Sequence, residues 1–148
     1  MKKILMLILL FLNTIEANAE ESIQRSAVIK AKTSVAAFNC FALNDYLGRS
    51  EESKRLFNLG YSTSIEFYKS MEHMQLDSKT INEEIPSIFL MVGGPTPDFK
   101  AGQVFSSVVE NTINSIYKDS QHNFEYDKPL RARKAEDLLH ENNCSLIR

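Results

Sequence analysis

Residues 28–48 read VIKAKTSVAAFNCFALNDYLG, and this stretch decides the fold class. Its apolar residues recur at spacings of three and four, which places them on one face of a helix. They are Val28, Ala31, Val35, Phe38 and Ala42. Lys30 and Lys32 lie off this face. We predict a helix from Ser22 to Leu47 that ends at Gly48, because glycine adopts the left-handed terminal conformation at little cost.

A second helix is predicted to follow directly. Ser50 can cap its first turn, and Glu51 and Glu52 suit the positive N-terminal end of a helix. Its apolar positions cover more than one face of the predicted helix, so we expect this helix to be buried on more than one side. These positions are Leu56, Phe57, Leu59, Tyr61, Thr63, Ile65, Phe67, Tyr68, Ser70 and Met74.

Residues 86–92, PSIFLMV, are ambiguous between helix and strand, because a short apolar run does not reveal its period. A buried strand would need a second strand to pair with, and the sequence offers none. We therefore interpret the run as a short buried helix that opens at Pro86, since proline favours the first helical turn. The polar segment before it, residues 77–84, has two candidate caps, Asp77 and Thr80.

Two more helices are predicted in the C-terminal half. Thr96 can cap the first and Pro97 can open it, and an inward stripe follows to about Lys118. That stripe consists of Phe99, Gly102, Phe105, Val109, Ile113 and Ile116. Asp127 can cap a last helix that runs from Lys128 or Pro129 to about residue 140. Together the segments predict an all-α fold, a compact single-domain bundle of four to five helices over residues 20–148 with one disulfide.

Residues 1–19 have the order of a cleavable signal peptide. Lys2 and Lys3 precede nine apolar residues, and the segment ends in the small-x-small triplet ANA at Ala19. Nine apolar residues are too few to cross a hydrocarbon core, which needs about 20 in a helix. We therefore expect cleavage after Ala19, a periplasmic location and no membrane insertion of the processed chain. The chain carries a net charge of −2 and this segment +1, which leaves −3.

Cys40 and Cys144 are the only cysteines, and both lie in the part expected to be exported. An even count in an oxidising compartment favours a disulfide. The bond would close a loop of about 100 residues, which stabilises a fold by about 4–5 kcal/mol in the chain-entropy model. Two free thiols are the alternative. A catalytic dithiol is disfavoured because the sequence contains no C-x-x-C pattern.

Two glycines lie on predicted apolar faces, Gly60 and Gly102. A glycine inside a helix costs about 1 kcal/mol against alanine, so each suggests a close helix contact, and the two could mark the same one. The loop before the third long helix contains Gly93, Gly94, Pro95, Thr96, Pro97 and Asp98. It resembles the start of an anion site, but prolines supply no N–H, so we favour a tight turn over a ligand loop.

The sequence carries no motif for chemistry. His73, His122 and His140 lie among polar residues, none three or four positions from another, so we interpret them as surface histidines and expect no metal and no cofactor. The pI near 5.9 does not favour nucleic-acid binding. The last helix carries a small basic patch beside acidic residues. That patch consists of Arg131, Arg133 and Lys134.

Two segments carry a resemblance to a known family. They read LFNLGY at residues 56–61 and GPTPDFKAG at residues 94–102. With an early and a late cysteine, these resemble a family of small exported proteobacterial proteins of unknown function. That family has the patterns L-F-x-x-G-Y-x-x-G and G-P-S-x-D-F-x-x-G-R-x-x-E. Ser64, Gln103 and Ser106 depart from them, and the resemblance implies no activity.

Three functions fit these observations. We favour a non-enzymatic periplasmic binding protein, an inhibitor or immunity-type protein that acts on a cell-envelope hydrolase or toxin, with another envelope protein as its partner. A small periplasmic hydrolase that uses a histidine and an acid is the first alternative. A structural envelope component is the second, and a homodimer formed by the broad face of the second helix would suit it.

Overall fold

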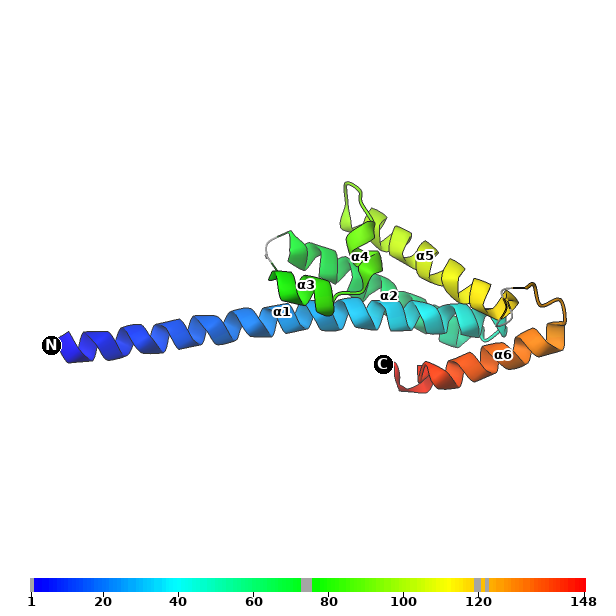
Figure 1. Cartoon of the computed structure of the whole chain (residues 1–148), viewed down its shortest axis with the longest axis horizontal. Coiled ribbons are helices and arrows are strands. Elements are labelled where there is room, and N and C mark those ends of the chain that lie inside the picture. The colour runs from blue at the N-terminus through cyan, green and yellow to red at the C-terminus, as the bar shows by residue number, and fades with distance from the viewer. Residues whose placement is uncertain (1, 73–75, 119–120, 122) are drawn as a thin grey trace.

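A computed structural model describes residues 2–72, 76–118, 121 and 123–148, and their side chains from residue 21 onward. Within this part of the chain the fold is all-α, as predicted (Figure 1). The only β feature there is an isolated antiparallel bridge between Lys118 and Phe124. The helices are α1 (Lys2–Tyr46), α2 (Ser50–Met71), α3 (Ser78–Glu83), α4 (Ser87–Met91), α5 (Pro97–Tyr117), α6 (Lys128–Glu141) and the 3-10 helix η1 (Cys144–Leu146).

Helix α1 is the longest element, and α2, α5, α6 and η1 all contact it. It begins at Lys2, not at the predicted Ser22, because no glycine or proline interrupts residues 1–47. The cleavage expected after Ala19 would fall inside this helix and stays a prediction. At the other end the chain reverses at Gly48, whose φ of +73° is the left-handed conformation that glycine permits.

The predicted caps are mostly confirmed. Asp77, Thr96 and Asp127 accept hydrogen bonds from the backbone N–H three residues later, at the starts of α3, α5 and α6. Ser50 is not a cap: it is the first residue of α2, behind Arg49, which makes no side-chain cap bond. Because residues 78–83 form a helix of their own, the described part holds six α-helices, not the four to five expected.

Two clusters of buried side chains form the core. The first joins α1, α2, α4 and α5, and its aromatic members are Phe38, Phe67, Tyr68 and Phe89. The second joins α1, α2, α5, α6 and η1, and it includes Leu43, Leu56, Ile116, Leu139 and both cysteines. One cluster therefore supports α4, and the other holds the C-terminal elements.

The most buried face of α5 is rotated from the one predicted, and the two share Ile116. Its buried residues are Ala101, Val104, Val108, Thr112 and Ile116, whereas Phe99 is about half exposed and Phe105 is only partly buried. The helix carries apolar residues over more than half of its circumference, so spacing alone did not fix its rotation. Small residues such as Ala101 face the neighbouring helices because they allow a closer approach.

Gly60 lies at a close crossing of α1 and α2. A Cβ at this position would lie 2.6 Å from Cδ1 of Phe38, whose ring is fully buried. The expectation for Gly102 is wrong, because a Cβ there would meet no atom within 4 Å. The two glycines therefore do not mark one contact: Gly60 lies under a ring and Gly102 lies beside open space.

This difference gives a matched pair of substitutions. We expect Gly60→Ala to lower the free energy of unfolding by about 1–3 kcal/mol, because the added methyl group overlaps a buried ring that has no room to move. Gly102→Ala should leave it unchanged or raise it by about 0.4–1 kcal/mol, since alanine restricts the unfolded chain. Urea unfolding followed by circular dichroism measures both. Equal effects of the two substitutions would contradict the close crossing.

Candidate functional site

The turn from Gly93 to Asp98 joins α4 to α5. Gly94 has a φ of +147°, and Thr96 Oγ1 accepts a hydrogen bond from the Phe99 N–H at 3.2 Å. Pro95 and Pro97 offer no N–H, and Asp98 places a negative charge in the first turn of α5. These features are compatible with a tight turn, and the preference for a turn over a ligand loop stays a prediction.

Hydrogen bonds and one ring contact hold this turn in place. Gln103 Nε2 donates to the Gly93 carbonyl at 2.7 Å, and the Tyr61 hydroxyl donates to the Asp98 carbonyl at 3.4 Å. A Cβ at Gly94 would overlap the Phe99 ring, so this ring lies directly on the glycine backbone. The turn is therefore fixed from both α2 and α5.

Large apolar side chains are exposed at both ends of the turn. Leu90, Met91 and Phe99 are 48%, 79% and 54% exposed. We call these three residues the α4–α5 surface. Most exposed apolar residues of a soluble protein are isolated and need no explanation, but several large ones around one fixed turn are typical of an interaction site.

Aromatic packing below α4 supports this surface. The Phe89 ring lies 4.7 Å from the Phe67 ring, centroid to centroid, and the buried Tyr68 hydroxyl donates to the Phe89 carbonyl at 3.2 Å. Lys100 Nζ lies 5.4 Å from the centroid of the Tyr68 ring. Burial raises the pKa of Tyr68 well above its ordinary value of 10.0. The predicted helix at residues 86–92 is thus present as α4, but only Phe89 of it is buried.

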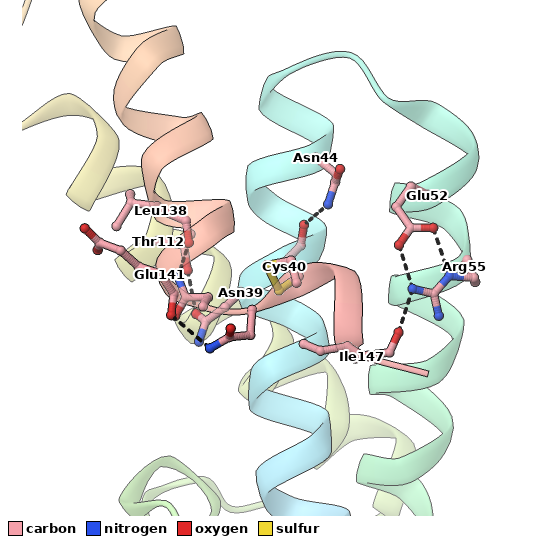
Figure 2. Close-up of a disulfide and its surroundings, with 12 residues drawn as sticks. Asn39, Cys40, Asn44, Glu52, Arg55, Thr112, Leu138, Glu141 and Ile147 are labelled. Atoms are coloured by element: carbon pink, nitrogen blue, oxygen red, sulfur yellow. Dashed lines mark hydrogen bonds and ion pairs between the residues drawn. A yellow bond between two sulfur atoms is a disulfide. The ribbon is translucent and has the colours of Figure 1, made fainter.

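The disulfide between Cys40 and Cys144 is confirmed, with a Cα–Cα distance of 5.5 Å (Figure 2). It ties η1 to the C-terminal part of α1, six residues before the end of that helix. Asn44 Nδ2 donates to the Cys40 carbonyl at 2.8 Å, and Arg55 Nη2 donates to the Ile147 carbonyl at 2.9 Å. The C-terminal segment is therefore fixed to α1 by a covalent bond and to α2 by a hydrogen bond.

Arg55 also binds Glu52 through two hydrogen bonds, at 2.9 and 2.6 Å, and Figure 2 shows this guanidinium between the carboxylate and the Ile147 carbonyl. The hydrogen bonding to Arg55 lowers the pKa of Glu52. Because this carboxylate stays charged, it holds the guanidinium in position for the C-terminal carbonyl.

A pocket of about 330 Å³ opens beside the disulfide. Its walls include Glu52, Glu136, His140 and Ser145. Glu52 is engaged by Arg55, and Glu136 forms an ion pair with Arg49. His73 and His122 lie outside the described residues. Of the three histidines, His140 is thus the one that the structure places near acids and a serine, and no hydrogen bond joins its ring to another described residue.

A second, larger pocket of about 760 Å³ lies between α1 and α3. Arg25 and Lys32 line it from α1, and Asp77 and Glu84 line it from the two ends of α3. Lys32 Nζ lies 2.6 Å from Glu84 Oε2, and this bond lowers the pKa of Glu84. The sequence did not reveal this pocket, because it exists only when residues 77–84 fold back onto α1.

Among the described residues, no group of three or more histidine, cysteine or acidic side chains is placed to hold a metal ion. No helix in that part of the chain has the length and apolarity to cross a membrane. The chain matches no protein-family model, no curated protein and no solved structure.

We expect the disulfide to contribute strongly to stability. Cys40→Ala combined with Cys144→Ala should lower the free energy of unfolding by about 2–5 kcal/mol, because the bond closes a long loop in the unfolded chain. The residues stand 104 positions apart. Denaturant unfolding of the oxidised protein, the reduced protein and the double variant measures this, and the last two should agree. Two thiols per chain in the non-reduced exported protein would contradict the bond.

Tyr68 gives a pH-dependence whose sign follows from its burial. Its pKa in the folded state lies above the unfolded value of 10.0, so the stability it contributes is complete below pH 10. Above that pH the unfolded chain ionises first, and stability falls. We expect the midpoint temperature of thermal unfolding to fall less between pH 9 and 11 for Tyr68→Phe than for the wild type. Tyr126→Phe is the control, because Tyr126 is exposed; a smaller loss for this variant as well would contradict the assignment.

Proposed function

We propose that this chain is a non-enzymatic binding protein of the periplasm. It acts on another envelope protein, as an inhibitor or immunity-type protein against a cell-wall hydrolase or an imported toxin. The α4–α5 surface is the observation that carries the proposal. It offers Leu90, Met91 and Phe99 to solvent around a turn that protrudes from the helices (Figure 1).

The support beneath this surface favours binding. A side chain held in place before contact loses little conformational entropy when the partner arrives. Phe99 lies on Gly94, and α4 is anchored through Phe89 and Tyr68 in the first core cluster. Exposed aromatic and large aliphatic side chains on such a rigid base are typical of the few residues that dominate binding energy.

The expected export and charge support a partner in the envelope. With cleavage after Ala19, the processed chain would carry a net charge of −3, as described above. A negative net charge speeds association with a basic partner and fixes its orientation more than it adds affinity. The apolar surface then supplies most of the binding energy.

The pocket beside the disulfide favours a second candidate, a small hydrolase that uses His140 and an acid. The pocket brings this imidazole near Glu136 and Ser145. We rank the hydrolase second because Glu136 already pairs with Arg49 and Glu52 with Arg55. A catalytic histidine needs an acid or nucleophile within hydrogen-bond reach.

The binding proposal is tested with the exported protein on a resin and envelope extract as the source of partner. We expect the wild type to retain a specific protein that Met91→Ser combined with Phe99→Ser retains roughly thirtyfold more weakly, which corresponds to about 2 kcal/mol at a dominant contact. The retained protein, once purified, should lose hydrolytic or toxic activity when it is bound by the wild type.

Ile29→Ser is the matched control, because Ile29 is as exposed as Phe99 but lies on α1. It should retain the partner as the wild type does. The proposal fails if no specific partner is retained under several conditions, or if the double variant and the wild type retain it equally.

A further inference from the structure

A second exposed apolar group lies on the connection between α5 and α6 and on the first turn of α6. Phe124, Tyr126 and Leu130 are 58%, 83% and 53% exposed, and the two rings stack with their centroids 6.0 Å apart. We call these three residues the tip. Figure 1 places this connection at the end of the molecule opposite the N-terminus. It is thus separate from the α4–α5 surface.

The described backbone around the tip is held by hydrogen bonds. The Glu125 N–H donates to the Tyr117 carbonyl at 2.8 Å, next to the bridge between Lys118 and Phe124. Asp127 Oδ1 accepts from the Leu130 N–H at 3.0 Å, and Glu125 Oε1 accepts from the Asp127 N–H at 2.9 Å. The tip side chains therefore face solvent from a backbone that is fixed on both sides.

Three cations lie near the tip along the chain. Lys118, Lys128 and Arg133 form no ion pair with another described residue, and Arg133 lies three positions after Leu130, on the same side of α6. The nearby carboxylates of Glu125 and Asp127 accept backbone N–H groups. This end of the molecule thus combines exposed apolar side chains with three cations that form no ion pair with a described residue and two carboxylates bonded to backbone N–H groups, in a chain whose net charge is negative.

The other two basic side chains of α6 are engaged within the protein. The Arg131 guanidinium lies 4.4 Å from the centroid of the Tyr117 ring, and Lys134 Nζ donates to the Lys118 carbonyl. They anchor α6 to the end of α5. The basic patch noted in the sequence is therefore divided, since Arg133 alone remains free among its three members.

We propose that the tip binds the surface of an anionic phospholipid bilayer. Cations without an ion pair lie beside these exposed apolar side chains, and this combination suits an anionic lipid surface. At a bilayer interface, inserted aromatic and aliphatic side chains and the attraction of nearby cations to anionic headgroups act together. Phenylalanine, tyrosine and leucine on a projecting end, flanked by free lysine and arginine, fit that chemistry. This inference does not depend on the proposed function.

The absence of tryptophan from the sequence allows a direct test. Tyr126→Trp introduces a single indole at the tip, in the full chain. We expect its emission to shift to shorter wavelength with vesicles of phosphatidylglycerol and phosphatidylcholine, and not with phosphatidylcholine alone. Lys128→Gln combined with Arg133→Gln in this background should weaken vesicle binding about fivefold per charge removed. High salt should weaken it as well.

Met91→Trp is the matched control, because this side chain is as exposed as Tyr126 but lies on the α4–α5 surface. Its emission should not shift with vesicles, even if residues 1–19 bring the chain to the membrane. The proposal is overturned if Tyr126→Trp does not shift, if it shifts equally with uncharged vesicles, or if Met91→Trp shifts as much. A shift with envelope proteins but none with anionic vesicles would replace the bilayer by a protein partner.

Discussion

The Phe38 ring lies directly on the backbone of Gly60, and this contact sets how closely α1 and α2 approach. Ser34 Oγ donates to the Gly60 carbonyl at 2.8 Å in the same crossing. Ser64 follows one turn later and is fully buried, with no hydrogen-bond partner for its hydroxyl among the described residues. Small side chains are thus required where the two helices cross, and α5 packs onto the pair through Phe105, 5.2 Å from Phe38.

The two core clusters on either side of this crossing give each end of the molecule its own support. The first cluster holds α4 through Phe89, so the α4–α5 surface rests on buried aromatic rings. The second cluster and the disulfide hold α6 and η1. Partly buried apolar side chains such as Phe57 and Phe105 pack around the first cluster, and the most exposed ones, Met91 and Tyr126, lie outside both clusters.

Local signals predicted local structure well. Thr96 and Asp127 each begin a helix. Their side-chain oxygens accept a hydrogen bond from the backbone N–H three residues later, and this local bond does not depend on where the helix packs. The rotation of α5 was not predictable in this way, since Val104 and Phe105 are both apolar and only the neighbouring helices select which one is buried. For the same reason Gly102 suggested a contact that the structure does not contain, whereas Gly60, in an equally apolar setting, lies under a ring.

The sequence by itself determined the all-α class, most of the helix starts and the pairing of the two cysteines, because these depend on neighbours along the chain or on a count of two. The predicted apolar face of α1 is largely buried, whereas only the tertiary structure decided the pockets, the inward face of α5 and the exposed apolar groups. Phe89 and Met91 stand two positions apart in one helix, yet one is buried and the other faces solvent. Exposure depends on which helices lie opposite, and that arrangement follows from packing between segments far apart in the chain.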